Sequence, residues 1–202
     1  MSDSDLSKGE ATRQAILQEA VRIASVDGLE GLSIGGLSKH LGLSKSGLFG
    51  HFRSKENLQI QVLHAGRDIF VDNVVRPAVK APRGLPRVQA LFDQWLQWAA
   101  TSKLPGGCLF VAVSVELDDR PGPLRDVVVH EQELWIQTID KAAAIAVDEG
   151  HFRADLDTRQ FAFEMHAVLL GCHHFFRLLD DKQAFERGRA AFARLMSSAQ
   201  NS

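Results

Sequence analysis

Hydrogen-bond donors and positive charges are concentrated in one short segment of the sequence, LGLSKSGLFGHFRSK, at residues 41–55. Residues 31–60 hold four lysine or arginine side chains against one carboxylate, a local charge of +3 in a chain whose formal net charge is −2. Within the segment, Ser44, Lys45 and Ser46 form a run of hydroxyl and ammonium donors, groups that suit phosphate oxygens. Local rather than overall basic character therefore indicates a nucleic-acid contact confined to this part of the chain.

Two other groups of side chains raise the question of metal binding or catalysis. GCHHFF places Cys172, His173 and His174 in succession, but neighbouring helical residues point about 100° apart and cannot share one ion. Asp118 and Asp119 stand beside a Pro-Gly turn, where solvated carboxylates are common. The sequence contains no GxxxxGK[ST], GxGxxG or HExxH motif, and the glycines of GLEGLSIGGLS lack the strand context that a phosphate loop needs. We therefore predict no catalytic residue, no metal site and no cofactor, and expect that the protein is not an enzyme.

Helical periodicity along the whole chain predicts an all-α fold. In TRQAILQEAVRIA, residues 12–24, apolar residues recur with a period of 3.6, and Gly28 ends the helix. Further helices are expected at residues 33–41, from 44 onwards, and at 55–80, 86–102, 107–118, 123–149, 157–179 and 182–198. LFVAVSVEL has the composition of a strand, but a lone strand would have no partner, so helix is the better prediction.

The elements around the basic segment predict a helix-turn-helix. Ser33 and Ser44 are expected to cap two short helices, with Gly42 in a left-handed conformation between them and Ser54 capping the helix that follows. Apolar residues at matching spacing would hold the helices together: Leu37, Leu41, Leu43, Leu48 and Phe52. The second helix would face DNA with its free N–H groups, and Gly47 would let its backbone approach the duplex. The alternative is a solvated turn between core helices.

At these residues the chain resembles the DNA-binding domain of the tetracycline-repressor (TetR) family, over TRQAILQEAVRIASVDGLEGLSIGGLSKHLGLSKSGLFGHFRSKENLQIQVL, and especially LSKSGLFGHFRSKE. GGCLFVAVSVELDDRPGPLRD, residues 106–126, is similar to the helical C-terminal half of one branch of that family. The resemblance implies a homodimer on a palindromic double-stranded DNA operator, with a small-molecule effector in the C-terminal half that alters the separation of the recognition helices.

Carried over by position, the resemblance implies the DNA-binding residues Ser33, Lys45, Ser46, Gly47, Phe49, His51 and Lys55, and Ser44 joins them as a side-chain donor at the start of the reading helix. Lys45, Ser46 and Gly47 fall on the reading helix, and the others near the DNA backbone. Most family members have tyrosine where this chain has Phe49. The hydroxyl that would bind phosphate is therefore missing, and Phe49 is expected to act mainly by packing.

The C-terminal half is expected to hold the partner and the effector. The helix near 157–179 is apolar nearly all round and must be buried on more than one side, which predicts a two-plus-two helix dimer interface with the final helix. The predicted interface residues are Met165, Leu169, Cys172, His173, Phe176, Phe185 and Phe192. The alternative is a central core helix of a monomer.

Aromatic and aliphatic residues on several helices could line an effector pocket, with His166 as its polar contact. The candidates are Trp95, Trp98, Leu109, Phe110, Val113, Trp135, Ile139 and His166. Aromatic residues at helical spacing are also common in ordinary cores, and the resemblance favours the pocket. The effector would be largely apolar and planar or elongated.

These patterns together predict a DNA-binding domain at residues 1–55 and a ligand-binding and dimerisation domain at residues 56–202. The predicted function is a ligand-responsive, sequence-specific regulator, a repressor released from its operator by a small apolar ligand. Two alternatives stay open: a helical interaction protein that no longer reads DNA, and an activator on the same fold. There is no apolar run of 18 residues and no secretory signal, so we expect a cytoplasmic protein without a membrane partner and with two reduced cysteines.

Overall fold

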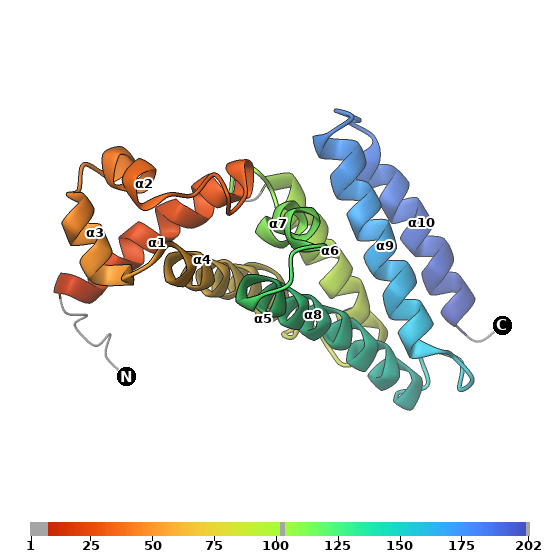
Figure 1. Ribbon diagram of the computed structural model, residues 1–202. Helices are drawn as coiled ribbons and strands as arrows, with labels where there is room; N and C mark the ends of the chain where they lie inside the picture. The colour runs from red at the N-terminus through yellow and green to blue at the C-terminus, as the bar shows by residue number, and fades with distance from the viewer. Residues whose placement is uncertain (1–7, 102–103, 201–202) are drawn as a thin grey trace. The chain divides into compact units, whose positions relative to one another are not determined.

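The computed structural model of the chain describes residues 8–101 and 104–200. Every regular element in these ranges is helical, which confirms the predicted fold class (Figure 1). The elements are α1 (Lys8–Asp27), α2 (Ile34–Leu41), α3 (Lys45–Phe52), α4 (Lys55–Phe70), the π-helical turn η1 (Val71–Val75), α5 (Arg76–Ala78), α6 (Leu85–Thr101), α7 (Leu109–Leu117), α8 (Pro123–Asp148), α9 (Thr158–Arg177) and α10 (Ala184–Ala199). LFVAVSVEL is helix α7, as predicted.

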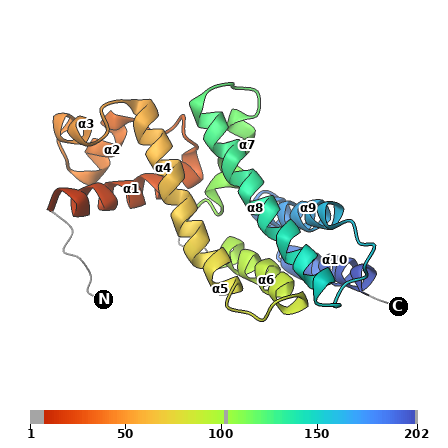
Figure 2. The same cartoon turned by 90° about the horizontal axis from the view of Figure 1, so that it is seen from below.

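The helices form two compact units, which we describe separately. The first unit contains the described residues up to Asp68 together with residues 104–128, and the second contains residues 69–101 and 129–200. The first unit therefore combines α1 to α4 with α7, although α7 follows α6 in the chain. Figure 2 shows α1, α2 and α3 next to one another beside the first half of α4.

The predicted helix starts in the first unit are confirmed at the level of single hydrogen bonds. The Ser33 hydroxyl accepts a hydrogen bond from the N–H of Gly36, and the Ser44 hydroxyl accepts one from the N–H of Gly47, each over 3.0 Å. Gly42 has a φ of 66°, and its N–H turns back to the carbonyls at the end of α2. Side-chain caps and a left-handed glycine thus fix the turn between α2 and α3.

Two glycines let α7 and the turn before it pack directly on the N-terminal helices. A Cβ added to Gly66 of α4 would lie 2.5 Å from a methyl carbon of Leu109. Gly106 lies against α1, where its N–H donates to the Ser25 hydroxyl over 3.1 Å. A Cβ at Gly106 would lie 1.6 Å from the Ser25 carbonyl oxygen. The missing side chains therefore set how closely α7 approaches α1 and α4.

The second unit is built around a close pair of antiparallel helices, α9 and α10, which pack along their length (Figure 1). The Phe92 ring of α6 stacks on the Phe192 ring of α10 with centroids 3.8 Å apart and planes within 6°. Gly188 of α10 leaves room for the Cys172 thiol of α9, because a Cβ at that glycine would lie 2.1 Å from the sulfur. Aromatic and small side chains from helices far apart in sequence thus form this core.

The helix predicted at residues 55–80 continues past α4 with altered geometry. The five residues of η1 adopt the wider π-helical turn, with the N–H of Arg76 bonded to the carbonyl of Val71. Pro77 has no N–H to continue the regular pattern, and α5 ends just after it. The helix therefore adjusts before the proline instead of stopping at it.

Candidate nucleic-acid interface and effector region

Helix α3 presents its predicted reading residues to the surface. Lys45, Ser46 and Gly47 are exposed in its first turn, whereas Leu48 and Phe52 are fully buried against the rest of the unit. The buried pair fixes the rotation of α3, so that its other side is available to a partner. A capped helix N-terminus with exposed donors is suited to phosphate oxygens.

Two predicted backbone contacts lie further along α3, with different surroundings. His51 is half-buried with its ring centroid 6.1 Å from that of Phe52. Phe49 is 53% exposed. The Phe49 ring therefore lies on the surface of the subunit rather than in its core, and its expected role by packing stays a prediction about contact with DNA.

The remaining predicted DNA contacts flank α3. Ser33 is exposed at the start of α2, and Lys55 is exposed at the start of α4. The ammonium group of Lys55 forms an ion pair with Glu30 over 3.3 Å, a contact that the sequence did not reveal. Sequence reasoning also gave Arg53 no role, although it is exposed directly after α3 with a φ of 63°. A non-glycine residue with that φ is uncommon, and its side chain adds a cation beside the predicted contacts.

In the second unit, five predicted pocket residues are largely withdrawn from solvent. Trp95 and Trp98 of α6 and Trp135 and Ile139 of α8 are buried, and His166 of α9 is half-buried. The Phe70 ring contacts two of the indoles edge-on, with centroids 6.3 Å from Trp98 and 5.2 Å from Trp135. Trp95 instead meets the imidazole of His173, at 6.5 Å.

Several polar atoms of this aromatic group are buried without a partner. Among the residues that the structure describes, the indole N–H groups of Trp98 and Trp135 and Nδ1 of His166 are buried and make no hydrogen bond. Burial lowers the pKa of His166, so its imidazole is held in the neutral form. A buried polar group without a partner costs roughly 1–3 kcal/mol, so these atoms mark a region that would gain from a polar ligand group.

The other three predicted pocket residues belong to the first unit. Leu109, Phe110 and Val113 are buried on α7, and Leu109 packs against Gly66. They form part of that unit's core. The structure thus brings Trp98 and Trp135 together with Phe70 and places the α7 residues with the N-terminal helices.

The predicted dimer-interface residues are mostly buried inside the subunit. Met165, Leu169, Cys172, His173 and Phe192 are at most 8% exposed. Cys172 lies beside Gly188 of α10, and His173 and Phe192 contact aromatic rings of α6. Phe176 and Phe185 are half-buried and contact each other, with centroids 4.6 Å apart. As long as the subunit keeps this packing, the first five have almost no surface to offer a partner.

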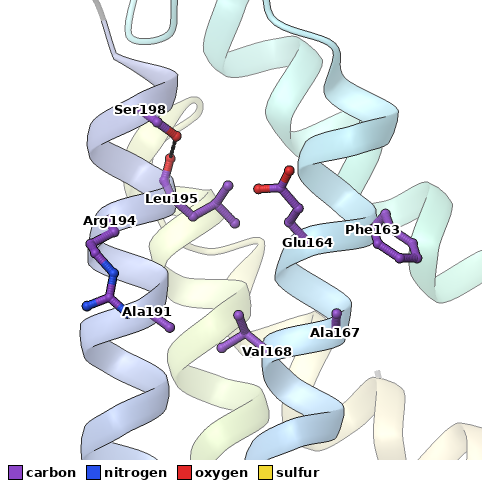
Figure 3. Close-up of a pocket in the computed structure, with 8 residues that line it drawn as sticks. All are labelled: Phe163, Glu164, Ala167, Val168, Ala191, Arg194, Leu195 and Ser198. Carbon is purple, nitrogen blue, oxygen red and sulfur yellow. Dashed lines mark hydrogen bonds between the residues drawn. The ribbon is translucent and has the colours of Figure 1, made fainter.

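A different side of α9 and α10 is open and carries an apolar groove (Figure 3). It is lined by Phe163, Glu164, Ala167, Val168, Ala191, Arg194, Leu195 and Ser198. Phe163 is 66% exposed. Phe175, near the end of α9, and Leu178, directly after it, are also exposed. The sequence predicted that α9 is apolar on several sides, and the groove is the side that the subunit leaves uncovered.

His173 gives the second unit a predicted pH dependence. Burial, aided by the nearby Arg177 and His174, lowers the pKa of His173 to about 4. The unfolded chain, with an ordinary imidazole, binds the proton more readily, so stability should fall as the pH drops from about 6.5 towards 4. Urea unfolding at a fixed protein concentration should show a loss of roughly 1–2 kcal/mol between pH 7 and pH 5. The His173→Phe variant should lose less of its free energy of unfolding between pH 7 and pH 5. An equal loss in that variant would contradict the assignment of the pH dependence to His173.

Comparison with known sequences and structures shows what kind of protein carries these features. The sequence profile of bacterial regulatory proteins of the tetR family matches residues 16–62, and that of the tetracyclin repressor-like C-terminal domain matches residues 84–192. Together the two profiles span most of the chain. The chain belongs to the TetR family. Among curated proteins no sequence matches it.

Solved structures of TetR-family regulators have the same fold. A regulator from Cytophaga hutchinsonii superposes with a TM-score of 0.86 at 20% identity, covering 98% of this chain and 100% of that one. A regulator from Chloroflexus aurantiacus J-10-FL superposes with a TM-score of 0.85 at 24% identity, covering 95% of this chain and 96% of that one. AibR, solved in complex with isovaleryl coenzyme A and operator DNA, superposes with a TM-score of 0.71 at 20% identity, covering 91% of this chain and 95% of that one.

Family membership assigns general roles to the parts described above. As a TetR-family transcriptional regulator, the chain has a DNA-binding helix-turn-helix in α2 and α3 and a ligand-binding C-terminal domain. The predicted family is confirmed, and the segments LSKSGLFGHFRSKE and GGCLFVAVSVELDDRPGPLRD, which carry the resemblance, fall within the residues that the two profiles match. Within the described ranges, no helix is both long enough and apolar enough to cross a membrane.

Proposed function

We propose that this TetR-family regulator is a homodimeric repressor that binds a palindromic operator and is released from it by a small, largely apolar ligand. The observation that carries the proposal is α3, a capped helix held by Leu48 and Phe52 with Lys45, Ser46 and Gly47 exposed. We assign DNA binding to residues 1–55, and ligand binding and dimerisation to residues 56–202. Catalysis has no part in this function.

The exposed residues of the helix-turn-helix divide into two roles. Lys45, Ser46 and Gly47 lie where a helix in the major groove meets base edges, and we assign them the reading of sequence. A second set lies on α3 or at neighbouring helix ends, where contact with sugar and phosphate would position the protein on the duplex. This second set comprises Ser33, Ser44, Phe49, His51 and Lys55.

We place the second copy of the chain on the α9–α10 groove. Its apolar floor would be costly to leave in water, and Glu164 and Arg194 bring opposite charges to the same groove. A two-fold interface pairs each surface patch with itself, so a patch that contains both charges can be self-complementary. A second copy of the chain would therefore match the charges of this groove and cover its apolar residues.

The effector is assigned to the aromatic group of the second unit. Phe70, Trp98 and Trp135 would supply apolar contact, and the two buried indole N–H groups require hydrogen-bond acceptors. We therefore add to the predicted apolar ligand at least one acceptor, such as a carbonyl or carboxylate oxygen. AibR, a structural neighbour solved with isovaleryl coenzyme A, has a ligand whose acyl group combines a short apolar chain with a carbonyl acceptor.

The test is DNA binding by the purified full-length protein. Fluorescence anisotropy with fragments from the region upstream of its own gene, at two salt concentrations, should give sequence-dependent binding that weakens steeply with salt. Lys45→Ala should change the ranking of operator variants, whereas Lys55→Ala should weaken binding to all of them about equally. Sequence-independent binding alone at low salt would rule out the proposal.

A further inference from the structure

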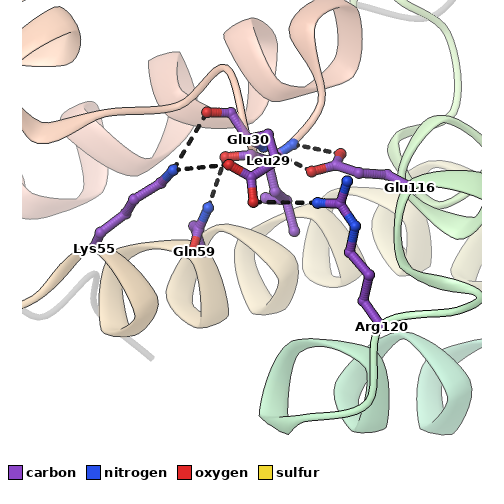
Figure 4. A network of polar contacts seen from close by, with 6 residues as sticks. All are labelled: Leu29, Glu30, Lys55, Gln59, Glu116 and Arg120. Carbon is purple, nitrogen blue, oxygen red and sulfur yellow. Dashed lines mark hydrogen bonds and ion pairs between the residues drawn. The ribbon is translucent and has the colours of Figure 1, made fainter.

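The turn between α1 and α2 is held by side chains from α4, from α7 and from the segment after α7 (Figure 4). The Glu116 carboxylate accepts the backbone N–H groups of Leu29 and Glu30 over 2.8 and 2.7 Å. The Leu29 carbonyl accepts a hydrogen bond from the buried amide of Gln59 over 2.6 Å. Before them, Gly28 has a φ of 70° and leaves no room for a side chain beside Glu116. The backbone of the turn is therefore fixed in place.

The fixed turn sets the side chain of Glu30 between two cations. One carboxylate oxygen, Oε2, pairs with the Lys55 ammonium over 3.3 Å, and the other, Oε1, pairs with the Arg120 guanidinium over 3.3 Å. Lys55 also donates to the carbonyl oxygen of Glu30 over 3.3 Å. Lys55 and Arg120 thus share one counter-charge.

Lys55 is one of the residues that the proposed function places against the DNA backbone. In the free protein, its charge is already matched by Glu30. The pair is exposed and its distance is longer than the 2.7–2.9 Å typical of a strong charge-assisted bond. Exposed pairs of this kind are weak and exchange easily, so a phosphate oxygen can replace the carboxylate.

We propose that Glu30 is an internal competitor of DNA phosphate for Lys55, and that Arg120 shifts the competition towards DNA by holding the other oxygen of Glu30. The inference rests on the proposed DNA binding. Glu116 acts as a positioning residue, because its two backbone hydrogen bonds hold Glu30 where both cations reach it.

The arrangement connects residues of the C-terminal region to a proposed DNA contact through Glu30. Glu116 lies on α7 and Arg120 follows it, and both fall within the part of the chain matched by the C-terminal family profile. Lys55 falls within the part matched by the DNA-binding profile. If α7 shifts so that Arg120 no longer pairs with Glu30, Glu30 pairs with Lys55 alone. DNA binding then weakens, because Lys55 is less available to phosphate.

The experiment is a set of double-mutant cycles on operator DNA, with full-length protein and fixed salt. Glu30→Gln should tighten binding roughly three- to ten-fold and steepen the salt dependence by up to about one unit. In the Lys55→Ala background, the gain in affinity from Glu30→Gln should shrink to the gain expected from removing one negative charge near the DNA. Arg120→Ala should weaken binding roughly three-fold in the wild type and have little effect beside Glu30→Gln.

Glu56→Gln is the matched control, because it removes the same charge from the residue next to Lys55. Its effect should be small and independent of Lys55. Thermal melts confirm that each variant is folded. Equal gains from Glu30→Gln and Glu56→Gln, or gains unchanged by Lys55→Ala, would overturn the inference while leaving the proposed function intact. A wild type without sequence-specific binding would overturn the function itself.

Discussion

Ala167→Glu should convert the proposed dimer into monomers. Ala167 is exposed and lines the α9–α10 groove, so a two-fold interface there would bury two new carboxylates close together. Like charges forced together in a desolvated interface cost several kcal/mol, which predicts a dimer dissociation constant raised by about 100-fold or more. Analytical ultracentrifugation over a concentration series measures this shift. Operator binding should weaken in parallel, because a monomer occupies a single half-site.

The matched control is Ala193→Glu. Ala193 lies on α10 and is exposed, but does not line the groove. The same charge added there should leave both dimerisation and DNA binding close to those of the wild type. If Ala167→Glu also remained a dimer of wild-type strength, the second copy would have to bind elsewhere.

Gly106→Ala should destabilise the first unit strongly. Its new Cβ would overlap the Ser25 carbonyl oxygen and crowd the N–H of Val26. Both are backbone atoms of α1, so no side-chain rotation can make room and the turn before α7 must move away. We expect a loss of about 3 kcal/mol in the free energy of unfolding, at the upper end of the cost of overpacking. Urea unfolding at a fixed protein concentration measures the change.

Gly50→Ala provides the comparison. Gly50 lies within α3, and a Cβ there would meet no atom within 4 Å. Alanine is the better helix former, so this variant should be neutral or more stable by up to about 1 kcal/mol. A Gly106→Ala variant as stable as Gly50→Ala would contradict the close contact between the turn and α1.

Features fixed by short-range chemistry were predictable from the sequence. The caps at Ser33 and Ser44 and the left-handed Gly42 depend on residues within one helical turn, and all three are confirmed. Asp157 likewise caps α9, accepting the N–H groups of the second and third residues that follow it. The start of α3 is therefore determined by neighbouring residues and does not depend on tertiary contacts.

Features that depend on which helices meet were not predictable in the same way. Helix α9 is apolar on several sides, and no periodicity tells which side faces the subunit core. Phe192 was assigned to the interface, but it stacks on Phe92, one hundred positions earlier in the chain. The groove lined by Phe163, Ala167 and Val168 lies on the side of α9 that the subunit leaves exposed, and that side is decided by how α6 and α10 pack on α9.

The polar contacts of Glu30 show the same limit at the candidate site. The position of Lys55 after α3 indicates a DNA contact, but its partner Glu30 lies in a turn 25 positions earlier. The second cation on Glu30, Arg120, lies beyond α7. Charge patterns in the sequence do not reveal such long-range pairs. Gly28, which the sequence identified only as a helix stop, also provides the space that Glu116 occupies.

The burial of both native cysteines makes this regulator suitable for site-directed labelling. Cys108 and Cys172 are each 4% exposed, and burial raises the pKa of Cys172 to about 11. Thiol reagents attack the thiolate, so Cys172 will react slowly at neutral pH. Ser46→Cys would introduce an exposed thiol on α3, and a pair of spin labels attached there would report the spacing of the two α3 helices of the proposed dimer in solution, with and without an effector.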